Sequence, residues 1–95
     1  MTDWADLQDV LNEALAQARC GKGFERHGSR LPLHEQPIMT IPKIQDSADG
    51  LIFQSCKKSL ESKRILELYG PEKAIQELYG AIVYLAAAVL WLRGK

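Results

Sequence analysis

The chain has 95 residues, which is enough for one domain with a modest hydrophobic core. Twelve basic and twelve acidic side chains give a formal net charge of zero, which argues against a protein that mainly coats nucleic acid. With 46% hydrophobic and 25% charged residues, the composition is typical of a folded globular protein rather than a disordered one. We therefore expect a single helical domain over residues 1–95.

The cysteines and the length of the longest apolar run indicate where in the cell the protein is expected. Cys20 and Cys56 have no CxxC or similar spacing, and the acidic N-terminus does not resemble a signal peptide. A cytoplasmic location with free thiols is therefore expected. The longest apolar run has twelve residues, Ala81 to Leu92, whereas a bilayer needs roughly 20. The sequence thus predicts no membrane partner, and the run predicts a core or interface helix.

The first predicted helix covers residues 3–20. Apolar residues from Trp4 to Ala18 recur at steps of three and four, and Thr2 is a suitable N-cap residue. Gly21 is typical of the position after a helix C-terminus. The first 18 residues contain four acidic side chains and no basic one. We expect a solvated acidic outer face rather than a metal site.

A long segment, residues 21–46, follows the first helix. Its glycines and prolines interrupt regular structure every few residues, and connections of this length in small domains are often functional. Ile38, Ile41 and Ile44 are expected to pin the segment to the core. A short helical turn that begins at Pro37 and an extended edge strand both fit the pattern.

The second predicted helix covers residues 47–69. Asp46 or Ser47 can cap its start, and Gly70 suits the position after its end. Lysine and glutamate side chains surround an apolar stripe that we expect to be buried. The predicted stripe consists of Ile52, Phe53, Cys56 and Leu60.

The third predicted helix covers residues 71–93 and begins with Pro71 at its first position. It is apolar on nearly every side, so it must be surrounded by its own chain or by copies of it. Gly80 in its interior indicates a close backbone approach by a neighbour. Its main apolar seam, with steps of three and four, is Ile75, Leu78, Ile82, Leu85, Val89 and Leu92.

Two neighbouring helices cannot cover the third helix completely. The side away from the main seam carries Tyr84, Ala88 and Trp91, and an exposed aromatic patch usually marks a contact surface. We therefore predict a homo-oligomer, a dimer or higher, that closes over these three residues. A lid formed by the proline-rich segment is the alternative, and the two are compatible. The expected fold is an all-α, three-helix antiparallel bundle that assembles through the C-terminal helix.

The glycine-rich basic part of the long segment is the candidate binding site. Glycines let backbone N–H groups approach an anion, and lysine and arginine supply charge and forked donors. An aromatic ring there is able to stack on a nucleotide base. A solvated basic loop, paired with the acidic helix of a neighbour, is the alternative. The predicted ligand-binding residues are Lys22, Phe24, Arg26, His27, Arg30 and His34.

The sequence predicts no catalytic residue, metal site or cofactor. His27, His34 and Glu35 match no zinc-binding spacing, and the glutamates of the last two helices lack the i, i+3 pairing that favours magnesium chelation. Cys56 is expected to be buried and inert. Cys20 is at a helix C-terminus, where the helix dipole opposes a thiolate. A metal-dependent hydrolase is therefore the least favoured function.

These observations favour a small non-enzymatic binding protein. We expect a homo-oligomer that holds an anionic small molecule, such as a nucleotide, with its basic segment near the subunit boundary. The alternative function is a protein–protein interaction module, an inhibitor or adaptor, that acts through the long segment or the apolar C-terminal helix. Nucleic acid is an unlikely partner for a chain with no net charge.

Overall fold

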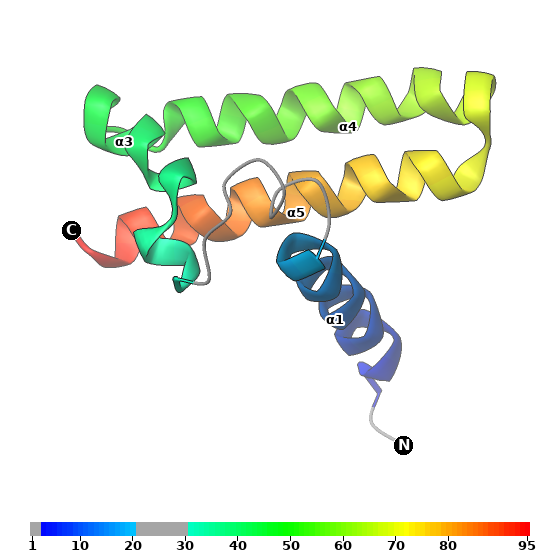
Figure 1. Ribbon diagram of the computed structural model, residues 1–95, viewed down its shortest axis with the longest axis horizontal. Helices are drawn as coiled ribbons and strands as arrows, with labels where there is room; N and C mark the ends of the chain where they lie inside the picture. The colour runs from blue at the N-terminus through cyan, green and yellow to red at the C-terminus, as the bar shows by residue number, and fades with distance from the viewer. Residues whose placement is uncertain (1–2, 21–30) are drawn as a thin grey trace.

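The computed structural model describes residues 3–20 and 31–95 of the chain. Its elements, in chain order, are α1 (Ala5–Cys20), the 3-10 helices η1 (Leu33–Glu35) and η2 (Pro37–Met39), α3 (Thr40–Gln45), α4 (Asp49–Tyr69) and α5 (Pro71–Arg93). The described residues contain no strand (Figure 1). The predicted all-α class is therefore confirmed.

The three long helices are present where the sequence predicts them. α5 has the predicted bounds, and α1 and α4 each begin two residues later than predicted. The prediction of three helices is wrong, because the described residues form a fourth α-helix, α3, within the segment predicted as a loop. The helical turn at Pro37 is confirmed, since this proline is the first residue of η2 and its fixed φ suits that position.

α4 and α5 lie side by side and run in opposite directions (Figure 1). The residues between them recur at alternating steps of three and four in both helices, and each is buried or half-buried. We call these residues the hairpin seam. The seam consists of Ala48, Leu51, Ser55, Lys58, Ser62 and Ile65 before and within α4, and Ala74, Glu77, Ala81, Tyr84, Ala88 and Trp91 in α5.

Small side chains let the two backbones of the hairpin approach closely. The Ser55 hydroxyl donates a hydrogen bond across the seam to the Ala81 carbonyl, with 3.1 Å between the two oxygens. The Lys58 ammonium lies 3.6 Å from the Glu77 carboxylate. A Cβ added to Gly80 would lie only 3.0 Å from Cδ of Lys58, so a side chain lies against this glycine and not the neighbouring backbone that the sequence predicts.

The predicted buried stripe of the second helix is wrong. Ile52, Phe53 and Cys56 are exposed, and Leu60 keeps 76% of its surface accessible. Serines occupy the seam in their place. A serine hydroxyl is buried at little cost when it has an acceptor, and Ser62 donates to the Ser59 carbonyl of its own helix at 2.6 Å.

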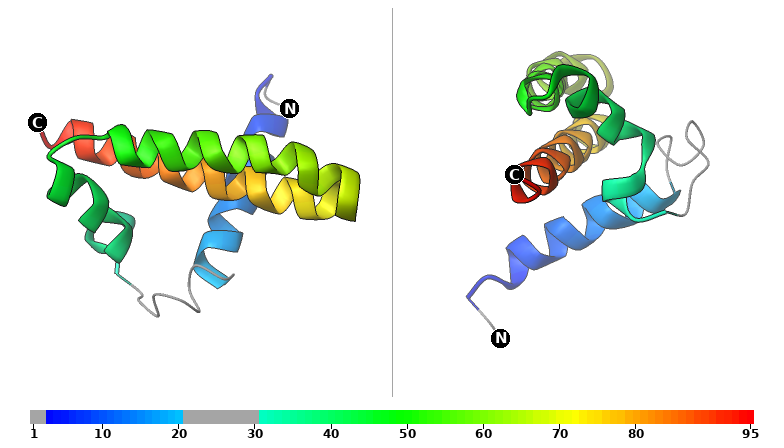
Figure 2. Two further views of the ribbon diagram at one scale, coloured as in Figure 1. Left: turned by 90° about the horizontal axis from the view of Figure 1, so that it is seen from above. Right: turned by 90° about the vertical axis from the view of Figure 1, so that its left-hand side faces the viewer.

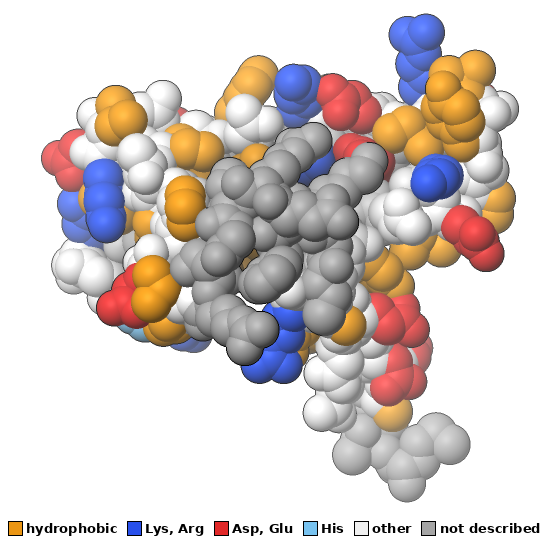
Figure 3. Space-filling model, viewed as in Figure 1, with side chains coloured by type: hydrophobic (Ala, Val, Ile, Leu, Met, Phe, Trp, Pro, Cys, Tyr) orange, Lys and Arg blue, Asp and Glu red, His pale blue; other side chains and the backbone are white. Residues whose placement is uncertain are grey.

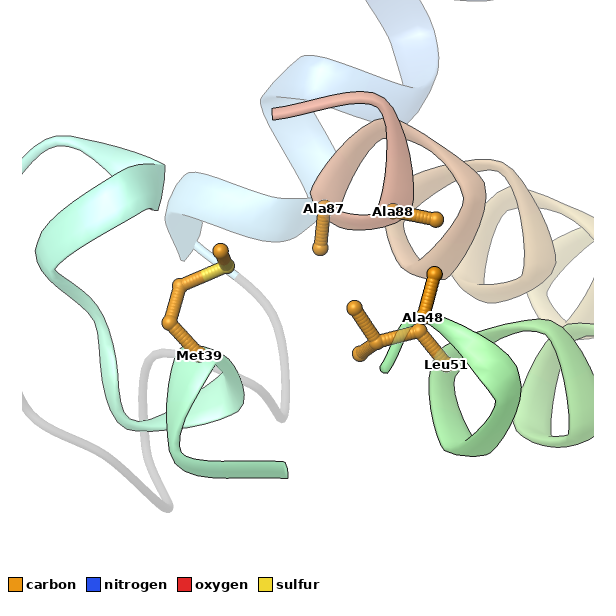
Figure 4. Packing of buried hydrophobic residues seen from close by; sticks show 5 residues of the cluster. All are labelled: Met39, Ala48, Leu51, Ala87 and Ala88. Atoms are coloured by element: carbon orange, nitrogen blue, oxygen red, sulfur yellow. The ribbon is translucent and has the colours of Figure 1, made fainter. Parts of the chain in front are cut away.

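The hydrophobic core lies where η2 meets the N-terminal end of α4 and the C-terminal part of α5. Figure 4 shows the side chains that form it. Ile38 and Ile41 pack against this core, as predicted, whereas Ile44 is exposed. The long segment is therefore pinned mainly by a methionine and not by the third isoleucine. The buried residues of the core are Met39, Ala48, Leu51, Ala87 and Ala88.

α1 crosses α5 instead of lying along the hairpin, so the prediction of a three-helix antiparallel bundle is correct only for α4 and α5 (Figures 1 and 2). Ala14 is the buried residue of the crossing. The Gln17 amide donates to the Gln76 carbonyl at 2.9 Å, and the Tyr79 hydroxyl donates to the Glu13 carboxylate. That hydrogen bond, with a smaller contribution from burial, raises the pKa of Tyr79.

Gly70 makes the turn between α4 and α5 possible. Its φ of 92° and ψ of 177° are almost restricted to glycine, and an added Cβ would have no atom within 4 Å. We expect Gly70→Ala to lower the free energy of unfolding by about 1–3 kcal/mol through backbone strain alone. Urea denaturation followed by circular dichroism measures the change. Gly94→Ala is the matched control, because Gly94 has an ordinary φ of −80°; equal midpoints for both variants would contradict the prediction.

Candidate functional site

The predicted anion-binding residues fall almost entirely outside the described part of the chain. Lys22, Phe24, Arg26, His27 and Arg30 lie in residues 21–30, and their role stays a prediction. The remaining candidate, His34, is exposed on η1.

The part of the chain that the structure describes holds neither a cluster of metal ligands nor an unpaired buried polar side chain. Within residues 3–20 and 31–95, no three side chains of His, Cys, Asp or Glu are grouped to hold a metal ion. In the same ranges, no buried side-chain nitrogen or oxygen lacks a hydrogen-bond partner that a ligand would supply. The described residues therefore direct attention to surfaces rather than to a pocket for chemistry.

The three residues predicted to form the oligomer interface belong to the hairpin seam. Ala88 is 5% exposed, and Tyr84 and Trp91 are half-buried against the hydrophobic core. The ammonium of Lys95 lies 4.2 Å from the centre of the Trp91 ring and adds a cation–π contact. The chain itself thus covers the side of α5 that we expected to be open. A role of these residues in assembly stays a prediction.

The apolar seam that we expected to be packed within the chain is the open side of α5. Of its six residues, five keep 42–59% of their surface exposed and the sixth, Ile82, is half-buried. We call this set the α5 stripe. It consists of Ile75, Leu78, Ile82, Leu85, Val89 and Leu92.

The α5 stripe faces away from the elements that cover the rest of α5. Leu85 and Val89 each lie two positions from Ala87, which is about 200° around a helix. Ala87 is fully buried in the same core as Met39 of η2. The stripe therefore points away from η2, and the N-terminal end of α1 leaves the hairpin on that same side (Figure 2).

Apolar side chains of α4 extend the stripe sideways. Leu78, Leu85 and Leu92 each follow a residue of the hairpin seam by one position, and Ile52 and Leu66 do the same in α4. Because the two helices are antiparallel, the same one-residue step turns these side chains to the same side of the hairpin. Ile52 and Leu66 are also exposed. One face of the hairpin is therefore broadly apolar and open.

The accessible area of the chain is large for its mass. The chain exposes 7250 Å², and a folded monomer of 10.7 kDa is expected to expose about 5,500 Å². The difference of about 1,700 Å² exceeds the roughly 800 Å² that each partner buries in a standard protein–protein interface. The radius of gyration, 13.9 Å, is also above the roughly 12.4 Å expected for this length. A stable interface therefore has enough area available.

α1 carries a second exposed apolar surface with negative charge beside it. Trp4, Leu7 and Val10 are exposed and, with Asp6, line a shallow hollow near the start of the helix. Acidic side chains gather along one edge of α1 (Figure 3). Within the described residues, Asp3, Asp6 and Asp9 form no ion pair. The N-terminal end of α1, which leaves the hairpin on the side of the stripe, is therefore acidic (Figure 2).

By length and composition alone, α5 is able to cross a membrane, and it is the only described helix with this property. The sequence predicts otherwise because its longest uninterrupted apolar run is too short. The sequence argument counts only uninterrupted apolar residues, whereas the helix as a whole is apolar on average even though charged residues such as Glu77 interrupt it. Composition alone does not decide between a membrane and a protein partner.

Comparisons with known proteins leave the function to be argued from these surfaces. No protein-family model matches the sequence, and no curated protein or solved structure matches it. The α5 stripe was visible in the sequence as a periodic seam. Its openness was not visible, because periodicity does not say which of two seams the chain itself covers.

Proposed function

We propose that this chain is a small non-enzymatic binding protein that works as a homo-oligomer, in which a second copy covers the α5 stripe. The observation that supports this proposal is the run of half-exposed leucine, isoleucine and valine side chains from Ile75 to Leu92 of the 23-residue helix α5. Contiguous apolar surface of this kind is rare on monomers and usually marks a contact site. The excess exposed area is enough for such a contact.

A second copy fits this surface better than a lipid bilayer does. The N-terminal end of α1, which leaves the hairpin on the side of the stripe, carries Asp3, Asp6 and Asp9, and anionic membrane surfaces repel these side chains. Glu72, Lys73 and Glu77 lie within the first two turns of α5, where a spanning helix would need apolar residues. A second copy presents the same apolar stripe, and its α5 carries opposite charges at its two ends, Glu72 in the first turn and Arg93 in the last.

For the ligand, we propose an anionic small molecule such as a nucleotide, bound by the basic segment and His34. This part of the proposal is supported by residue types alone, because residues 21–30 contain one lysine, two arginines and three glycines. We expected the site near the subunit boundary. Since η1 and η2 lie on the opposite side of the hairpin from the α5 stripe, His34 instead suggests a site on the outer side of the assembly.

Native mass spectrometry of the protein purified from cells tests both parts. We expect an ion of at least twice the chain mass of 10.7 kDa, together with a retained anionic molecule that denaturation releases. Sedimentation velocity at high micromolar concentration checks the assembly in solution. A compact monomer in both experiments would contradict the proposal, and so would recovery of the chain only with lipid vesicles. A complex with one copy and another protein would favour the adaptor alternative.

A further inference from the structure

The α5 stripe has the same spacing when it is read from either end. Its residues are separated by three, four, three, four and three positions. We propose, on the basis of the proposed homo-oligomer, that two copies pair antiparallel along this stripe about a two-fold axis. In this register Ile75 faces the partner's Leu92, Leu78 faces the partner's Val89 and Ile82 faces the partner's Leu85. Every residue of the stripe then meets another apolar residue, as in a coiled-coil seam.

The edge of the stripe next to α1 is complementary in size. Glu72, Tyr79, Ala86 and Arg93 follow one another at steps of seven, so they share one edge of the stripe. In the antiparallel register, Tyr79 meets the partner's Ala86. The Tyr79 hydroxyl also donates a hydrogen bond to Glu13 of α1. A partner helix at this edge must therefore leave space for the tyrosine ring and for α1. The exposed, small side chain of Ala86 leaves that room.

The same edge is complementary in charge. Glu72 lies in the first turn of α5 and Arg93 in the last. Within the described residues neither of them forms an ion pair. The antiparallel register places Glu72 beside the partner's Arg93, and the two-fold axis repeats this pair at the other end. Two interchain ion pairs therefore close the two ends of the interface.

A parallel pairing of the same stripes lacks these contacts. It brings the two Glu72 ends together and the two Arg93 ends together, and it aligns the two helix dipoles, which is unfavourable. The ion pair between Glu72 and Arg93 cannot form within one chain. Twenty-one residues separate Glu72 from Arg93, which is about 32 Å along a helix. A contact between them requires two chains.

The assembly that follows pairs the two hairpins through their open faces, with the two α5 helices in contact along the stripe and each α4 beside its own α5. Ile52 and Leu66 lie on the open face of the hairpin beside the stripe, so they contribute apolar area at the sides of this four-helix core. The acidic α1 helices leave the hairpin on the interface side and border it (Figure 2).

A charge swap tests the register. Sedimentation velocity over a dilution series gives the dimer dissociation constant for Glu72→Arg, for Arg93→Glu and for the double variant. We expect each single change to weaken the dimer about 10-fold at low ionic strength, since two attractive pairs become two repulsive ones. We expect the double variant to return to within about twofold of the original protein, because it restores both pairs with opposite polarity.

The control is the swap Lys57→Glu with Glu61→Lys, which reverses an ion pair within α4 and is expected to leave the dissociation constant unchanged. Circular dichroism checks that every variant is folded. As a second measurement, Ile82→Cys and Leu85→Cys chains, in a background where Cys20 and Cys56 are serine, are expected to form a mixed disulfide when combined under oxidising conditions.

The outcomes separate this inference from the proposed function. Rescue by the double variant, together with the mixed disulfide, supports the antiparallel register. A dimer whose dissociation constant is unaffected by the single changes, or is not rescued by the double change, overturns the register and leaves the homo-oligomer standing. A wild-type chain that is monomeric at high micromolar concentration overturns both.

Discussion

Leu51→Ala is expected to lower the free energy of unfolding by about 2–5 kcal/mol. Leu51 has no exposed surface and is the largest aliphatic side chain that is fully buried. The other buried residues of this core are Met39 and three alanines, and the alanines are too small to fill the space that the change would leave (Figure 4). For a domain with a total stability of about 5–15 kcal/mol, this loss is large.

Urea denaturation at one fixed protein concentration measures the effect, since the unfolding of an oligomer depends on concentration. Leu60→Ala is the matched control: it removes the same atoms from a side chain that is 76% exposed. We expect the control to change the stability by less than about 0.5 kcal/mol. Similar midpoints for the two leucine variants would show that the core does not lie between η2, α4 and α5.

Leu85→Glu is expected to weaken self-association by about 100-fold or more. Leu85 is near the middle of the α5 stripe, where a second copy would remove it from water, and an unpaired carboxylate in such a place is strongly unfavourable. Within one chain the change is tolerated, because the side chain is half-exposed and glutamate is a good helix former. The variant should therefore be a folded monomer.

Sedimentation equilibrium measures the association, and circular dichroism measures the helix content. Leu60→Glu on the exposed part of α4 is the control, with the same chemical change outside the proposed interface. If both variants associate as the wild type does, the α5 stripe is not the contact surface. If both become monomeric, the effect comes from added charge and not from the stripe.

The positions of the long helices were predictable because their ends carry strong local signals. Gly70 and Pro71 separate α4 from α5, and the structure ends one helix and begins the next at these residues. Ser47, which was predicted as a possible cap, lies one residue before the N-cap residue Ala48, and its hydroxyl accepts a hydrogen bond from the backbone N–H of Asp49 at 3.0 Å. These signals act over a few residues, so one sequence is enough to find them.

The sides of the helices were harder to assign. α4 and α5 each have two seams at helical spacing, one of large apolar residues and one, the hairpin seam, in which alanine or serine alternates with larger residues. The prediction assumed that the chain would bury the larger residues first. The structure packs the smaller ones, because Ala74, Ala81 and Ser55 permit a close approach of the two backbones. The larger residues remain outside, which is the reason that the chain offers an interface.

The anion site could be predicted only as a set of residue types. Charge and glycine content indicate which ligands suit residues 21–34, but the spatial arrangement of these side chains depends on the packing of the whole segment. His34 illustrates the limit. Its position on η1, on the far side of the hairpin from the stripe, follows from the burial of Met39, which no local pattern indicates.

The connectivity of the hairpin has a consequence for the order of folding. α4 and α5 are joined by one tight turn, so their contacts close short loops and form rapidly. The contact of α1 with α5 joins Gln17 to Gln76, 59 residues apart, and must form more slowly. We therefore expect newly made chains to display the self-complementary face before α1 has docked, so that pairing and the completion of the fold overlap in time.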